Sequence, residues 1–193
     1  MLENLSKYKI LLASKSPRRQ ELLKSLRIKY NCISLSGLDE SYPQSLEAEE
    51  VPEFLANKKA DGYSSVIQGN ELLITADTLV ILEDRILGKP KNHSEAVAML
   101  NALSGKIHKV VTGVCISTKS QRKSFSVITE VKFAEISESD INYYVNTFTP
   151  FDKAGAYGIQ EWIGCVAVEW IRGSYYNVMG LPVHRLYEEL KKL

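Results

Sequence analysis

Short apolar runs alternate with segments of helical periodicity along this chain. Apolar runs of about four to eight residues, bounded by polar clusters, predict strands, and apolar residues spaced three and four apart predict helices. The predicted strands cover residues 9–13, 29–35, 72–82, 110–117, 124–136 and 166–168. The predicted helices begin at Ser16, near Pro52, at Asn92, at Ser137 and at Pro182.

Strands and helices intermix without an internal repeat or a Pro- or Ser-rich linker. Segments 110–117 and 124–136 are rich in β-branched residues and are joined by a short polar stretch, which predicts an antiparallel hairpin. The sequence therefore predicts a mixed α/β fold whose sheet is at least partly antiparallel. We expect residues 1–193 to form a single domain, since one hydrophobic core can grow to this size.

The composition excludes several classes of protein. Hydrophobic residues make up 45% and charged residues 24%, which is ordinary for a globular domain and excludes collagen-like or disordered chains. Lysine and arginine number 24 against 23 acidic residues. This balance provides no strong positive electrostatic potential for binding nucleic acid or an anionic membrane. No stretch approaches the ~18 apolar residues of a membrane-spanning helix.

The cysteines are three in number and far apart, at Cys32, Cys115 and Cys165. An odd count with wide spacing fits neither a disulfide framework nor a zinc site. We interpret them as small half-buried hydrophobic residues in a reducing compartment. The sequence thus predicts a cytoplasmic protein with neither a nucleic-acid nor a membrane partner.

The first candidate for chemistry lies where the predicted strand 9–13 meets the helix that begins at Ser16. Free backbone N–H groups make such a junction attractive to anions. Arg18 and Arg19 stand in the first helical turn, where cations are unfavourable unless an anion lies against them. The alternative is a pair of surface arginines tied to nearby carboxylates, and this segment by itself does not decide between the two.

The second candidate is Asp77, an aspartate between the apolar runs 72–76 and 79–82. A bare carboxylate is costly to bury, so it persists where it binds a cation, accepts hydrogen bonds or acts as a general base. The alternative is an aspartate that caps a neighbouring loop. The apolar runs on both sides favour a functional aspartate.

Other polar residues carry little signal when taken one at a time. Lys59 is an ordinary lysine near a helix C-terminus, Lys89 lies where the chain leaves a predicted hairpin, and Glu40 lies in a polar loop. The small residues around Tyr157 allow close backbone approach by a planar ligand, or else a tight loop on the core.

Taken together in order, these segments resemble the Maf family of nucleoside triphosphate pyrophosphatases. The matching motifs are ASKSPRR at 13–19, ADT at 76–78, GKP at 88–90, SGK at 104–106, TGV at 112–114, DKAGAYGIQ at 152–160 and GSY at 173–175. They extend over essentially the whole chain, and the run 152–160 is the most specific. The resemblance implies a mixed α/β fold with an elongated sheet and two lobes around a central nucleotide cleft.

The resemblance also implies an activity, namely hydrolysis of a nucleoside triphosphate to the monophosphate and pyrophosphate with a divalent cation, Mg²⁺ or Mn²⁺. Asp77 is then the proton acceptor and, with Glu40, places the metal. The implied phosphate-binding residues are Ser14, Arg19, Lys59 and Lys89. Phosphoryl chemistry needs positioning and charge neutralisation more than covalent catalysis, which suits this set.

Within the family, the resemblance implies the subgroup that acts on dTTP, UTP and related modified pyrimidine nucleotides. Three positions match that subgroup, Arg18, Thr78 and Gln160. A rival hypothesis is a nucleotide-binding regulator of septum formation that does not hydrolyse, and another is a house-cleaning enzyme for deaminated purines. The complete set of Asp77, Lys59 and Lys89 disfavours the first, and Gln160 disfavours the second. A homodimer is compatible with the resemblance.

Overall fold

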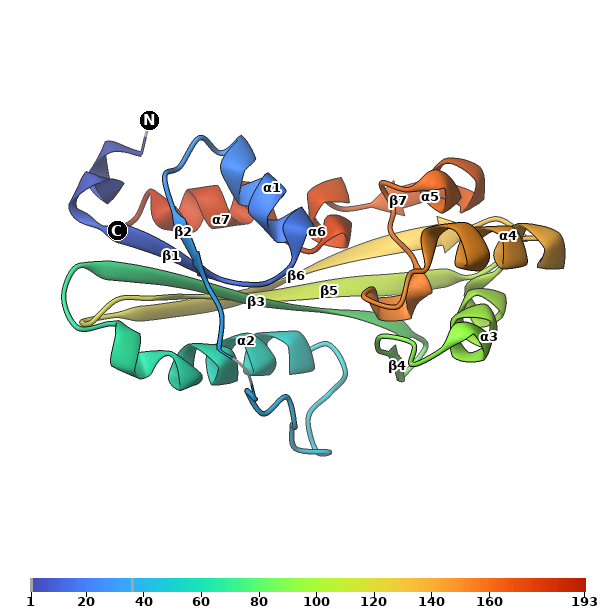
Figure 1. The fold of residues 1–193 in the computed structure, drawn as a ribbon, viewed down its shortest axis with the longest axis horizontal. Coiled ribbons are helices and arrows are strands. Elements are labelled where there is room, and N and C mark those ends of the chain that lie inside the picture. Colours follow the sequence, from blue (N-terminus) through green and yellow to red (C-terminus); the bar gives the residue numbers. More distant parts are fainter. Residues whose placement is uncertain (1, 36) are drawn as a thin grey trace. The chain divides into compact units, whose positions relative to one another are not determined.

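The computed structural model describes residues 2–35 and 37–193 (Figure 1). The strands are β1 (Lys9–Ala13), β2 (Asn31–Ile33), β3 (Glu71–Leu82), β4 (Arg85–Leu87), β5 (Ile107–Ser117), β6 (Arg122–Phe133) and β7 (Val168–Arg172). The α-helices are α1 (Pro17–Ser25), α2 (Val51–Gly62), α3 (His93–Leu103), α4 (Glu138–Phe148), α5 (Trp162–Ala167), α6 (Tyr175–Met179) and α7 (Val183–Leu190). Short 3₁₀ turns are η1 (Glu3–Lys7), η2 (Ser64–Val66) and η3 (Ala154–Ala156).

Within the described residues, the strands form one seven-stranded sheet in the order β2-β1-β3-β5-β6-β7, with β4 added on β3. β1 runs parallel to both β2 and β3, whereas β4 pairs antiparallel with β3 and β7 antiparallel with β6. β5 and β6 are neighbours joined by a short turn in which the Thr118 N–H donates to the Gln121 carbonyl. The predicted mixed α/β fold with a partly antiparallel sheet is confirmed.

The chain divides into two compact units. The first comprises Met1–Asp77, Thr112–Val127 and Gly180–Leu193, and the second comprises Thr78–Val111 and Ile128–Met179. In the first unit α2 packs its small residues Ala56 and Ala60 against Leu11, Leu73 and Cys115 of the sheet. The core of the second unit is built largely from α3, α4, the sheet and the loop that contains Tyr157. The single-domain prediction for 1–193 and the predicted nucleotide cleft stay predictions.

Most predicted elements are present, and one is wrong. Residues 166 and 167 end the short helix α5, and strand β7 begins only at Val168. Ile163 and Ala167, four residues apart, are both buried, so the helical spacing governs this segment. A three-residue apolar run does not distinguish a strand from the last turn of a helix. The described part of the chain also contains no helix long and apolar enough to cross a membrane.

The close packing of α2 against Gly113 on β5 explains why the TGV motif contains a glycine. A Cβ at this position would lie 2.2 Å from the Pro52 carbonyl carbon and 2.2 Å from the Glu53 backbone nitrogen. Only glycine therefore lets the first turn of α2 lie so close to the sheet.

We expect Gly113→Ala to destabilise the protein by about 1–3 kcal/mol, because overpacking against backbone cannot relax through a rotamer change. Thermal unfolding measures this loss. The control is Gly69→Ala, whose Cβ would meet only a Glu71 carboxylate oxygen at 3.6 Å. Equal melting temperatures for the two variants would contradict the predicted close approach.

Candidate active site

The centre of the candidate site is an ion pair between a strand and a helix. Asp77 lies near the middle of β3 and Lys59 lies in the last turn of α2, and the Lys59 Nζ is 2.5 Å from Asp77 Oδ1. Their side chains are only 14% exposed for Lys59 and 13% exposed for Asp77. A partly buried pair in this geometry interacts more strongly than a surface salt bridge.

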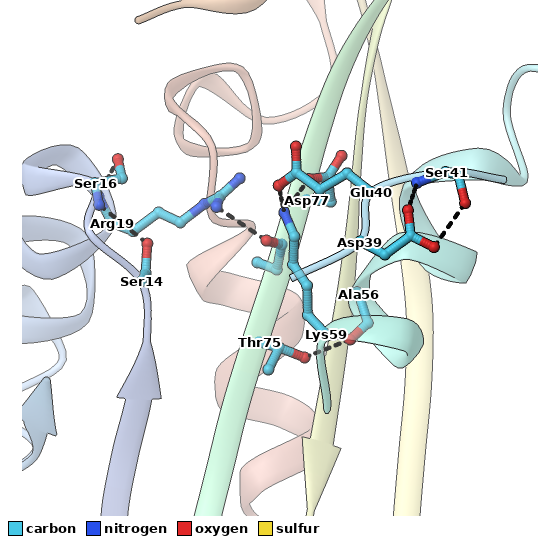
Figure 2. Close-up of polar contacts among 11 residues, drawn as sticks. Ser14, Ser16, Arg19, Asp39, Glu40, Ser41, Ala56, Lys59, Thr75 and Asp77 are labelled. Carbon is cyan, nitrogen blue, oxygen red and sulfur yellow. Dashed lines mark hydrogen bonds and ion pairs between the residues drawn. The ribbon is translucent and has the colours of Figure 1, made fainter. Parts of the chain in front are cut away.

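A buried hydrogen bond sets the register of these two elements. The Thr75 hydroxyl donates to the Ala56 carbonyl at 2.7 Å. Thr75 and Asp77 are two apart on a strand and share one face, while Ala56 and Lys59 are three apart on a helix and are neighbours. The Thr75–Ala56 contact therefore brings Lys59 opposite Asp77, as Figure 2 shows.

Glu40 supplies a second carboxylate to the same lysine. Its Oε1 lies 2.9 Å from the Lys59 Nζ, and its side chain is 57% exposed. The amine thus lies between the two carboxylates (Figure 2). The sequence prediction that grouped Glu40, Lys59 and Asp77 is consistent with this geometry, although their chemical roles remain predictions.

The loop that carries Glu40 is fastened by its neighbour Asp39. The Asp39 carboxylate accepts hydrogen bonds from the Ser41 N–H and hydroxyl, both at 2.8 Å. Lys58 donates to Asp39 at 2.7 Å and to the Ser41 carbonyl at 2.7 Å. These hydrogen bonds, led by that of Lys58, lower the pKa of Asp39 to about 2. Asp39, Lys58 and Thr75 are not among the site residues predicted from the sequence, although each lies one or two positions from a residue that is.

Ser14, Ser16 and Arg19 occupy the junction between β1 and α1. Ser16 caps the helix by accepting the Arg19 N–H, and the Ser14 hydroxyl accepts the Ser16 N–H at 3.2 Å. The Arg19 guanidinium donates to the Gly180 carbonyl at 2.8 Å and to the Ala76 carbonyl at 2.9 Å.

The Arg19 guanidinium is hydrogen-bonded to the carbonyl of Ala76, the residue that precedes Asp77. Burial lowers the pKa of Arg19, while the charge of Asp77 opposes that shift, and Glu40 opposes it more weakly. Arg19 therefore belongs to the same electrostatic cluster as the two carboxylates. Arg18 follows Pro17 in the first turn of α1 and is half-buried.

The other predicted site residues belong to the second unit. Thr78 follows Asp77 on β3, and Lys89 and Gln160 are exposed. The Gly155 N–H donates to the Gly88 carbonyl at 3.0 Å, which fastens the segment of Lys89 to the loop 152–160. The structure therefore groups Ser14, Arg19, Glu40, Lys59 and Asp77 in one unit, and it places Lys89 beside the Gln160 loop in the other.

Glu40 and Asp77 are the predicted ligands of a divalent cation, and each places one carboxylate oxygen against the Lys59 Nζ. Mg²⁺ is commonly held by one or two carboxylates, with waters and substrate phosphates completing its shell. Among the residues that the structure describes, no three His, Cys, Asp or Glu side chains gather as a ready-made metal site. Glu40 and Asp77, which both contact the Lys59 amine, are the carboxylates that could hold a cation arriving with a phosphorylated substrate.

Comparison with known proteins decides the family. The model of the Maf-like protein family matches residues 9–193. The chain belongs to the Maf family. A relative named dTTP/UTP pyrophosphatase from Phocaeicola vulgatus is 57% identical over 193 residues and is covered completely, as is this chain. A relative of the same name from Bacteroides thetaiotaomicron is 54% identical over 193 residues with the same full coverage of both chains.

Among solved structures, a HAM1 protein from Coxiella burnetii aligns with a TM-score of 0.46 at 16% identity. The alignment covers 96% of this chain and 100% of that one. The family assignment depends on the sequence matches, and all the motifs that suggested the Maf family lie within the matched residues.

Proposed function

We propose that this Maf-family protein hydrolyses dTTP, UTP and related modified pyrimidine nucleotides to the nucleoside monophosphate and pyrophosphate. The observation that carries the proposal is the partly buried Lys59–Asp77 pair, joined by Glu40 and fixed by the Thr75–Ala56 hydrogen bond. The names of the full-length relatives support the same substrates.

The proposed roles follow from charge and position. Asp77 accepts a proton from the attacking water, because a carboxylate at a polar site is a suitable general base. Lys59, Lys89 and Arg19 neutralise negative charge on the triphosphate, and Ser14 donates a hydrogen bond to it. The Gly180 and Ala76 carbonyls already fix the orientation of the Arg19 side chain. Little conformational entropy is therefore lost when Arg19 binds the triphosphate.

A divalent cation, Mg²⁺ or Mn²⁺, would be held by Glu40 and Asp77 and would neutralise charge on the triphosphate. We expect hydrolysis to stop when a chelator is added and to return when either metal is restored in excess. Steady-state assays of pyrophosphate release measure this. Turnover that persists in excess chelator would contradict a metal role for Glu40 and Asp77.

Base recognition is assigned to Arg18, Thr78 and Gln160. Uracil and thymine present an N3–H donor beside the O4 acceptor, and the Gln160 amide can meet both. We expect Gln160→Glu to cost dTTP and UTP about 1–3 kcal/mol of transition-state binding, because the carboxylate removes the donor to O4. Activity on CTP relative to UTP should rise. Equal kcat/KM ratios in the two proteins would show that Gln160 does not read the base.

The proposal is tested by the products. Purified protein with dTTP and Mg²⁺ should release dTMP and pyrophosphate, resolved by ion-exchange chromatography. Release of dTDP and orthophosphate as primary products would overturn the proposed bond cleavage. Binding of dTTP without turnover would instead favour the septum-regulator hypothesis, which the ion-paired Asp77 and the relatives' names disfavour.

The proposal also covers localisation, assembly and partners. We propose that the protein acts in the cytoplasm, where nucleoside triphosphates are made and used, and that it forms a homodimer. Neither a nucleic acid nor a membrane is expected as a partner, because the formal charge of +1 supplies no basic field.

A further inference from the structure

A buried polar network lies in the second unit, outside the residues assigned above. Its centre is the Glu161 carboxylate, which is 19% exposed and follows Gln160 directly. Glu161 Oε1 lies 3.1 Å from the Nζ of Lys153, whose side chain is 9% exposed. Glu161 Oε2 accepts a hydrogen bond from the Tyr144 hydroxyl. Both carboxylate oxygens are therefore held from different directions.

Tyr144 ties this carboxylate to the backbone of the loop. Its ring is fully buried on α4 and stacks on Phe148 with 5.1 Å between the ring centroids. Its hydroxyl oxygen accepts the Gly158 N–H at 3.1 Å. Burial and the Glu161 charge raise the pKa of Tyr144, so the hydroxyl keeps the proton that it donates to Glu161. The carboxylate is thus fixed relative to Gly158.

The Gln160 amide and the Glu161 carboxylate lie on the same side of Gly158. A Cβ added to Gly158 would lie 2.9 Å from Gln160 Nε2 and 3.1 Å from Glu161 Oε2. The amide nitrogen and the carboxylate oxygen therefore crowd one side of this α-carbon, in space that glycine leaves open. The oxygen in question is the one that Tyr144 holds.

To distinguish uracil from cytosine, the Gln160 amide must be held in one orientation. A glutamine amide rotated by 180° exchanges its donor and its acceptor, so it can pair with uracil in one orientation and with cytosine in the other. Reading by Gln160 alone would leave these two bases equivalent. A fixed carboxylate removes the equivalence, because it attracts the amide nitrogen and repels the amide oxygen.

We infer that Glu161 is a specificity-determining positioning residue, which holds the Gln160 amide with its nitrogen toward the carboxylate and so makes the protein select one pyrimidine pattern. This inference rests on the proposed function, and the names of the relatives indicate that the selected pattern is that of uracil and thymine. Lys153 and Tyr144 keep the carboxylate in place. Glu161 acts through Gln160 and takes no part in bond cleavage.

The experiment compares kcat/KM for UTP and CTP, which share the ribose and the triphosphate. In Glu161→Gln the charge is lost but the shape is kept, so the Gln160 amide can adopt both orientations. We expect the UTP/CTP ratio to fall about tenfold, which corresponds to about 1.4 kcal/mol. A purely structural role would lower both values together and leave the ratio unchanged.

The matched control is Glu130→Gln, which removes a carboxylate of the same unit that is ion-paired to Arg172 at 3.2 Å. Its UTP/CTP ratio should equal that of the unaltered protein. Tyr144→Phe provides a second test that keeps the Glu161 charge but frees one of its oxygens, and a smaller fall in the ratio is expected.

The outcomes separate the inference from the proposed function. If the unaltered protein hydrolyses neither UTP nor dTTP, the proposed function is wrong and the inference falls with it. If it hydrolyses UTP and CTP equally, or if both folded variants keep the original ratio, the inference about Glu161 is wrong while the proposed function stands. A lowered ratio in both variants, with the control unchanged, supports the inference.

Discussion

Asp77→Asn should lower kcat by about 10²–10⁴-fold while leaving the fold intact. The amide keeps the size and shape of the side chain, but it neither accepts a proton from water nor supplies negative charge to a cation. The Lys59 Nζ, now 2.5 Å from the carboxylate, would still find an amide oxygen to contact. Stability should therefore change far less than activity.

The matching control is Asp61→Asn. Asp61 lies on α2 and is ion-paired to Arg122 at 2.6 Å, but its side chain is 64% exposed and neither partner is among the proposed site residues. Assays of pyrophosphate release with dTTP, together with thermal melts, should show near-normal turnover for this variant. Near-normal turnover in folded Asp77→Asn would make Asp77 a structural aspartate and the proposed mechanism wrong.

The local pattern of the sequence predicted the elements that carry the site. Ser16 and Pro17 predicted the start of α1, and the apolar runs around Asp77 predicted the buried strand β3. Helix capping and strand burial depend on residues within a few positions of one another, so one sequence contains their signals. The run 166–168 was misread because α5 and β7 meet there without a polar boundary.

The contacts between distant residues could not be predicted in the same way. Thr75 bonds to a carbonyl 19 positions away, and Lys58 reaches an aspartate 19 positions away. Such pairings depend on how α2 packs on the sheet, which in turn depends on the missing side chain of Gly113. Resemblance to a family supplied the grouping of Glu40, Lys59 and Asp77, and the structure supplied the reason why they meet.

Lys58 and Lys59 allow an unusually direct comparison. They are consecutive on α2, and each pairs with one of two consecutive acids in the loop, Asp39 and Glu40 respectively. Consecutive helical side chains point about 100° apart, so only Lys59 also faces β3 and Asp77. The two lysines have the same chemistry and each pairs with a loop acid, but only Lys59 also contacts Asp77.

Lys59→Met should therefore lower kcat/KM for dTTP by about 10²–10³-fold, a loss typical of removing one preorganised charge from a reacting centre. Methionine fills the volume of the lysine stem, but it removes the ammonium group that contacts both the Asp77 and the Glu40 carboxylates. Lys58→Met is the control, and it should cost less than about fivefold, since an ion pair whose carboxylate is 67% exposed is worth ~1 kcal/mol or less. Both variants are assayed with saturating Mg²⁺, and their melting temperatures are compared. If the two variants lose activity equally, the cationic contribution comes from fastening the loop and the pairing of Lys59 with Asp77 has no special role in turnover.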